Sequence, residues 1–174
     1  LFLARDRLGI KPLYWTIAPG HFAFASEIKA LLAAGACPAK VNRDALAEYF
    51  TFQYTLGERT LFDGVVRREP GQYLTFRPFQ DVAPSIVRYW DFDYQIDTHH
   101  TFAYFSDRLL GLLEDAVALQ LRSDVPVGAY LSGGIDSTVV TCLAAPRYGG
   151  KFHVFTGAFD DGLEYDESSY ARLV

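Results

Sequence analysis

Short apolar runs separated by turn residues dominate the start of the chain. These runs cover residues 1–4, 13–17 and 21–25, and Gly9 and Pro12 favour a turn between the first two. Apolar runs of this length with flanking turn residues are typical of β-strands. The pattern therefore predicts three short strands in the first 25 residues.

Two amphipathic stretches follow these strands and predict helices. Residues 27–32 form the first stretch, with Ser26 as its expected N-cap and Gly35 as the residue that ends it. Residues 43–50 form the second stretch, and Asn42 is well placed to cap it.

The pattern changes in the middle of the chain. A type II turn at 69–72 and a strand at 73–76 are followed by residues 77–101, which have no sustained period and contain two prolines. Helical and strand patterns then alternate: helix 106–122, strand 125–131, loop 132–137, helix 138–145, strand 152–158 and a helix from Asp166 or Ser168. Such alternation with short connections predicts a parallel α/β sheet.

Composition indicates a globular protein with the length of about one domain. Of the 174 residues, 50% are hydrophobic and 21% are charged, and the formal net charge is −5. An acidic chain without a basic block is unsuited to non-specific nucleic-acid binding, and no apolar run is long enough to cross a membrane. Two cysteines are too few for a disulfide framework, so the expected location is the cytoplasm. Because the sequence starts at Leu1 and contains no methionine, we expect a fragment of a longer protein.

The loop at 132–137 carries the strongest chemical signal. It reads S-G-G-I-D-S and lies between a predicted strand and a predicted helix, where backbone N–H groups and the helix dipole favour an anion. Gly133 and Gly134 leave room for a phosphate and permit positive φ, and the hydroxyls of Ser132 and Ser137 add donors. Asp136 would repel a phosphate unless a cation lay between them, so the loop predicts a magnesium–pyrophosphate site.

A plain connection is the alternative interpretation of this loop, in which Gly and Ser make a tight turn and Asp136 caps the helix.

Two other kinds of phosphate loop are excluded by the sequence. No Gly-Lys-Ser or Gly-Lys-Thr follows, as a Walker A loop requires, and the spacing G-x-G-x-x-G of dinucleotide-binding loops is absent.

Four motifs resemble those of glutamine-hydrolysing asparagine synthetases, in the order in which that family carries them. S-G-G-I-D-S at 132–137 resembles the pyrophosphate loop of ATP pyrophosphatases, and residues 123–131 resemble the run before that loop in the synthetases. R-D-R-L-G-I-K-P-L-Y at 5–14 and F-A-S-E-I-K-A-L at 24–31 resemble two motifs late in the glutaminase domain. Y-D-E-S at 165–168 resembles a motif of the synthetase domain.

The resemblance implies parts of two domains. Residues 1–85 would be the C-terminal part of an N-terminal-nucleophile (Ntn) hydrolase glutaminase domain with αββα layers, and residues 86–101 would be a linker. Residues 102–174 would be the start of an adenine-nucleotide α-hydrolase-like parallel α/β domain that binds ATP. Because partial domains leave sheet edges and apolar faces uncovered, a fragment is expected to aggregate, to form a homodimer or to need further segments.

The implied function is a ligase that makes asparagine from aspartate, glutamine and ATP, with glutamate, AMP and pyrophosphate as the other products. ATP would activate the β-carboxylate of aspartate as an adenylate, which ammonia from glutamine would attack. Asp136 is the implied Mg²⁺ ligand. The residues that the resemblance assigns to ATP and pyrophosphate are Leu131, Ser132, Gly133, Gly134, Asp136, Ser137 and Gly157.

The glutaminase nucleophile of that family is absent from the sequence. It is a cysteine at the mature N-terminus, whereas Leu1 stands first here and Cys37 lies beyond the motif at 24–31. The chain by itself is therefore expected neither to hydrolyse glutamine nor to make asparagine. A relative that activates another carboxylate, such as a β-lactam synthetase or a peptide cyclase, stays open, and so does a non-catalytic scaffold. We expect the charged residues of the motif at 5–14 to form an ion-paired scaffold: Arg5, Asp6, Arg7 and Lys11.

Overall fold

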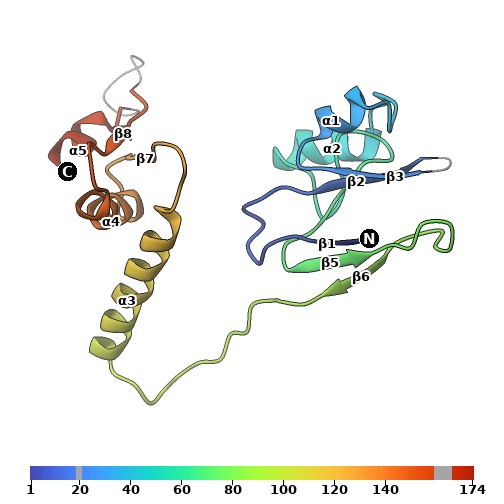
Figure 1. Ribbon diagram of the computed structural model, residues 1–174. Helices are drawn as coiled ribbons and strands as arrows, with labels where there is room; N and C mark the ends of the chain where they lie inside the picture. The colour runs from blue at the N-terminus through green and yellow to red at the C-terminus, as the bar shows by residue number, and fades with distance from the viewer. Residues whose placement is uncertain (19–20, 159–165) are drawn as a thin grey trace. The chain divides into compact units, whose positions relative to one another are not determined.

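The computed structural model describes residues 1–18, 21–158 and 166–174, which form two compact units, Leu1–Gln95 and Ile96–Val174 (Figure 1). The boundary between the units lies within residues 86–101, the linker that the family resemblance implies. The strand β6 (Ser85–Arg88) pairs with β5 of the first unit, so this unit extends into the first residues of that range.

Two three-stranded antiparallel sheets form the body of the first unit. One sheet has the order β1-β5-β6, in which β1 spans Phe2–Ala4 and β5 spans Gln72–Thr75. The other has the order β3-β2-β4, and its strands span His21–Ala25, Tyr14–Ala18 and Val66–Arg67. The predicted strands are confirmed: β3 has the predicted ends, and the ends of β1, β2 and β5 are shifted by at most one residue. β4 and β6 were missed because a strand of two to four residues between prolines and glycines shows no clear alternation.

Two helices cover one face of the sheet β3-β2-β4 (Figure 1). α1 spans Ile28–Ala33 and α2 spans Arg43–Phe52. Both predicted helices are confirmed, but Glu27 and not Ser26 occupies the N-cap position of α1, and its side chain makes no capping hydrogen bond. The buried centre of this layer consists of Leu31, Ala36 and Val65.

Aromatic side chains join the two sheets of the first unit. The ring of Phe22 stacks on Trp15 and on Phe76, with centroid distances of 5.6 and 4.7 Å. The two stacked antiparallel sheets agree with the inner layers of the αββα arrangement that the resemblance implies. On the outer face of β1-β5-β6, Phe2 is 63% exposed, and the described residues of this unit place no helix over it.

Main-chain hydrogen bonds, not ion pairs, organise the charged motif at 5–14. The Arg5 guanidinium donates to the carbonyls of Lys11, Arg68 and Gly9 at 2.5–3.0 Å. The Asp6 carboxylate accepts from the amides of Ile10 and Lys11, both at 2.9 Å, and these bonds lower the pKa of Asp6. The scaffold role is therefore retained, but the expected ion pairing within the motif is wrong, because backbone groups lie nearer to these charges than the opposite side chains do.

The Asn42 cap gives a direct test of how α2 is stabilised. Its side-chain oxygen accepts a hydrogen bond from the Ala45 amide at 3.1 Å. We expect Asn42→Ala to lower the free energy of unfolding by about 1 kcal/mol, because one amide of the first turn loses its partner. Both tryptophans of the chain lie in the first unit, so their fluorescence in a urea titration follows its unfolding.

Glu27→Ala is the matched control for this cap variant. Glu27 stands at the N-cap of α1 without a capping bond, and its ion pair with Lys29 is exposed. Its loss is expected to cost less than about 0.5 kcal/mol. Equal losses in the two variants would contradict the capping role of Asn42.

The second unit contains a β-α-β arrangement preceded by a long helix. α3 spans Phe102–Gln120, β7 spans Gly128–Tyr130, α4 spans Ile135–Ala144 and β8 spans His153–Phe155. A short 3₁₀ helix, η1 (Ala145–Arg147), extends α4, and α5 spans Ser168–Leu173. β7 and β8 are parallel, with Gly128 opposite His153 and Tyr130 opposite Phe155, so the predicted parallel pairing is confirmed.

Four elements of this unit have bounds that differ from the sequence pattern. α3 begins four residues earlier than expected, because the Thr101 hydroxyl caps it by accepting from the Tyr104 amide. α4 begins at Ile135 and not at residue 138, so Asp136 lies in its first turn. β7 and β8 have three residues each, fewer than the predicted strands at 125–131 and 152–158, and both are largely exposed.

Candidate functional site

The loop at 132–137 starts from a point that is fixed on β8. Leu131 is buried, its amide donates to the Phe155 carbonyl at 2.9 Å, and its carbonyl accepts from the Thr156 hydroxyl at 2.7 Å. Sequence reasoning missed Thr156, whose role depends on the parallel alignment of two strands. These bonds position the residue that directly precedes the loop, independently of any ligand.

Two serine hydroxyls hold the two ends of the loop together. The Ser132 and Ser137 oxygens lie 3.0 Å apart, and the Ser137 oxygen also accepts from the Ser132 amide at 3.2 Å. The Ser132 oxygen accepts from the Gly134 amide at 3.3 Å. The structure thus brings together both serines that the sequence proposed as hydroxyl donors, and they bond to the loop itself.

The N-terminus of α4 presents its amides to the side on which the loop lies. Gly134 is the N-cap, with φ −71° and ψ 161°, and it has no side chain with which to cap. In the described part of the chain, the amides of Ile135, Asp136 and Ser137 have no hydrogen-bond partner. Unsatisfied amides in a first helical turn favour a bound anion, and the helix dipole adds to that preference.

Asp136 does not cap α4, so the plain-turn alternative fails in that respect. Its carboxylate is exposed in the first turn, and it makes no ion pair or side-chain hydrogen bond with the described residues. No cluster of three metal-binding side chains was found among the residues that the structure describes. A site with one protein carboxylate fits Mg²⁺, which typically binds one or two carboxylates together with substrate phosphate oxygens and water.

The two glycines of the loop differ in conformation. Gly133 has φ +83°, which confirms the need for a residue that tolerates a left-handed backbone. Gly134 has an ordinary φ of −71°.

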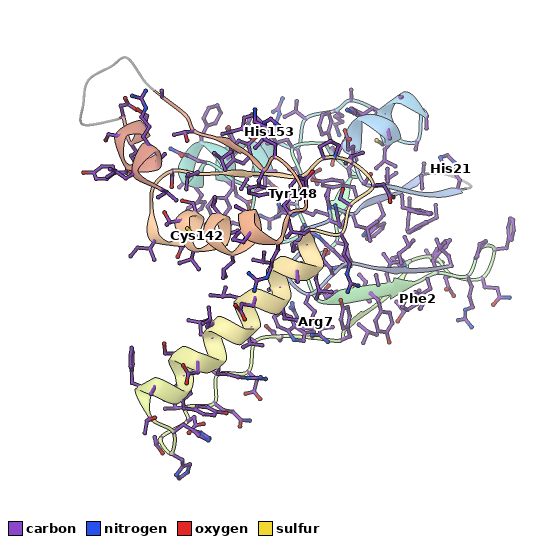
Figure 2. The ribbon with its side chains drawn as sticks, turned by 60° about the vertical axis from the view of Figure 1, so that its left-hand side comes forward. Phe2, Arg7, His21, Cys142, Tyr148 and His153 are labelled. Atoms are coloured by element: carbon purple, nitrogen blue, oxygen red, sulfur yellow. The ribbon has the colours of Figure 1, made fainter. Side chains whose placement is uncertain are left out.

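The other assigned residue, Gly157, is exposed and follows β8 after Thr156. Its chain neighbours from residue 159 to 165 lie outside the described residues, and so does the first residue of the Y-D-E-S motif. On the far end of α4, Tyr148 (labelled in Figure 2) accepts a hydrogen bond from the Val127 amide at 3.4 Å. This bond ties the end of the helix to the segment that enters β7.

None of the helices in the described ranges is both long enough and apolar enough to cross a membrane.

Comparison with known proteins gives two matches to family models. The glutamine amidotransferase domain matches residues 1–90, and asparagine synthase matches residues 108–174. The two matches fall on either side of the boundary between the compact units.

Named relatives cover almost the whole chain. Asparagine synthetase [glutamine-hydrolyzing] 3 of Bacillus subtilis is 37% identical over 97% of this chain and 28% of its own length. Asparagine synthetase [glutamine-hydrolyzing] 1 of the same organism is 36% identical over 94% of this chain and 24% of its own length. The amidase chyE of Penicillium rubens is 37% identical over 99% of this chain and 27% of its own length.

The chain thus spans about a quarter of the length of these relatives. The family models and the identities agree with the four motifs that the sequence carries. The chain therefore belongs to the glutamine-hydrolysing asparagine synthetase family.

Proposed function

We propose that this chain is part of an ATP-dependent amidotransferase that converts aspartate, glutamine and ATP into asparagine, glutamate, AMP and pyrophosphate. The observation that carries the proposal is the glycine loop at the N-terminus of α4, where three unsatisfied amides and two hydroxyls lie beside an exposed carboxylate. The named synthetases that share this stretch of sequence support it.

In this proposal the loop receives the pyrophosphate that leaves ATP. The aspartate β-carboxylate attacks the α-phosphorus, the bond from that phosphorus to pyrophosphate breaks, and ammonia then displaces AMP from the acyl carbon. The amides of Ile135, Asp136 and Ser137 would stabilise the charge that develops on the leaving group, because they are already oriented and need not reorganise. Leu131 and Gly157 would border the ATP at the ends of β7 and β8.

Asp136 would hold Mg²⁺ against the pyrophosphate, with the Ser132 and Ser137 hydroxyls nearby as donors to phosphate oxygens. When bound, the ion would supply charge neutralisation for the leaving group. The residues of the chain do the rest: they orient the loop and provide neutral donors.

We also propose the domain assignment that the motifs imply. The first unit would be the end of an Ntn-type glutaminase domain that releases ammonia from glutamine. The second would be the start of a nucleotide-binding domain of the adenine-nucleotide α-hydrolase type, to which the parallel pair β7-β8 and the crossover helix α4 would belong.

A second candidate is a relative that activates a different carboxylate. It is favoured by the amidase chyE, which is as similar to this chain as the first of the Bacillus synthetases. The loop chemistry is the same in both candidates, since it handles ATP and pyrophosphate and not the acceptor.

Acid-dependent exchange between ATP and labelled pyrophosphate distinguishes these candidates. The protein that carries this sequence, produced at its natural length, is incubated with ATP, Mg²⁺ and labelled pyrophosphate in the presence of single carboxylic acids. Exchange that requires aspartate is the expected result, because adenylation is reversible before ammonia attacks. Exchange with another acid alone would favour the second candidate, and no exchange with any acid would contradict adenylation.

A further inference from the structure

Helix α5 lies against the glycine loop, and the contact is made by its main chain together with the β-carbon of Tyr170. A β-carbon placed on Gly133 would lie 2.9 Å from the Ala171 nitrogen and 2.9 Å from the Tyr170 carbonyl carbon, and nearer still to the Tyr170 β-carbon. Non-bonded carbon atoms prefer separations of about 3.5–4.0 Å, so any side chain at 133 would displace α5. The sequence predicts that Gly133 leaves room for a phosphate. In the structure, α5 occupies that space beside Gly133.

Gly134 does not share this constraint. A β-carbon there would meet only the Ser132 hydroxyl, at 3.3 Å, and its φ is one that any residue adopts. The two adjacent glycines therefore have separate roles: Gly133 makes room for α5, and Gly134 leaves the other side of the loop open.

Few interactions within α5 itself stabilise this helix. The helix has six residues, none of them buried, and isolated helices of this length are unstable in water. Its start is reinforced locally, because the Asp166 carboxylate accepts from the amide and the hydroxyl of Ser168 at 2.9 and 3.0 Å. The close approach of Tyr170 to Gly133 adds a contact between residues that are 37 positions apart in the chain (170 − 133).

We infer that α5 is a positioning element of the glycine loop. The backbone of Tyr170 and Ala171 confines Gly133 to its left-handed conformation, which a free glycine would leave readily. Holding Gly133 in place keeps the Ser132 hydroxyl and the Gly134 amide in register. The inference rests on the proposed function for its ligand, which is the pyrophosphate of ATP.

Breaking α5 without touching the loop tests this inference. Arg172 is exposed and makes no hydrogen bond or ion pair with the loop among the described residues, and proline there removes a helical hydrogen bond and clashes with the preceding turn. In the protein of natural length, Arg172→Pro is expected to raise amide hydrogen exchange in α5 and to raise the KM for ATP by about tenfold or more, since small misplacements of binding groups cost that much. Arg172→Ala keeps the helix and is the matched control, with exchange and KM within about twofold of the wild type.

Gly133→Ala approaches the same contact from the other side. It is expected to raise hydrogen exchange in α5, whereas Gly134→Ala leaves that exchange unchanged. The melting temperature of each variant separates local release of α5 from global unfolding.

The outcomes separate this inference from the proposed function. If Arg172→Pro releases α5 and the KM for ATP stays at the wild-type value, α5 positions nothing and the inference is wrong. If Gly133→Ala leaves α5 protected, the contact itself is contradicted. If the wild-type protein shows no ATP dependence with any acid, the proposed function fails, and the exchange measurements still report on the contact between α5 and the loop.

Discussion

Asp136→Asn is expected to lower ATP-dependent pyrophosphate release by roughly 10²–10³ or more, while glutamine hydrolysis by the same protein stays within about twofold of the wild type. The substitution keeps the shape of the side chain and removes the charge that would hold Mg²⁺ against the pyrophosphate. In the proposed function, glutamine is hydrolysed by a separate nucleophile in the other domain, so that reaction has no direct need of Asp136.

Two assays on the protein of natural length check this expectation: pyrophosphate release with aspartate and ATP, and glutamate release from glutamine. Asp115→Asn is the matched control, because Asp115 is an exposed aspartate on α3 of the same unit. Asp136 also lies in the first turn of α4, where a carboxylate contributes roughly 0.3–1 kcal/mol through the helix dipole. Near-normal pyrophosphate release, with only a small fall in melting temperature, would show that this stabilising effect is the whole role of Asp136.

Glu58→Ala is expected to have the largest effect on stability, because it leaves the charge of a buried arginine unpaired. Arg68 is fully buried, its side chain pairs with the Glu58 carboxylate, and its Nε and Nη1 have no hydrogen-bond partner in the described residues. Burial lowers the pKa of Arg68, because it disfavours the charged form of the side chain. Removing one partner of a buried ion pair costs about 3 kcal/mol or more. Because the Glu58 side chain is 39% exposed, we expect a loss of about 3 kcal/mol here.

Arg68→Met is expected to cost less than Glu58→Ala, although it removes the larger side chain. It replaces the buried charge with a shorter, unbranched apolar chain, and Glu58 is exposed enough to be solvated alone. The change in unfolding free energy should stay within about 1 kcal/mol, since apolar replacements of buried ion pairs are often neutral or stabilising. The urea titration followed by tryptophan fluorescence measures both variants, with Glu27→Ala as the exposed control. A larger loss for Arg68→Met than for Glu58→Ala would contradict this account.

Features that depend on neighbours in the chain could be predicted from the sequence. The strands and helices of the first unit follow from short apolar runs, amphipathic spacing and the Asn42 cap, all of which act within a few residues. The strand–loop–helix setting of S-G-G-I-D-S was predicted in the same way, because parallel pairing of β7 and β8 follows from alternating helix and strand patterns.

Features that depend on distant partners were decided by the tertiary structure. β6 became a strand by pairing with β5, and Arg68 was buried by a fold that bonds its amide to the Leu13 carbonyl. The role of Gly133 likewise depends on Tyr170 and Ala171, and the anchoring of Leu131 depends on Thr156. The sequence determined which residues tolerate these environments, but only folding determined which atoms would meet, because contacts between remote segments are set by how whole elements pack and not by local pattern.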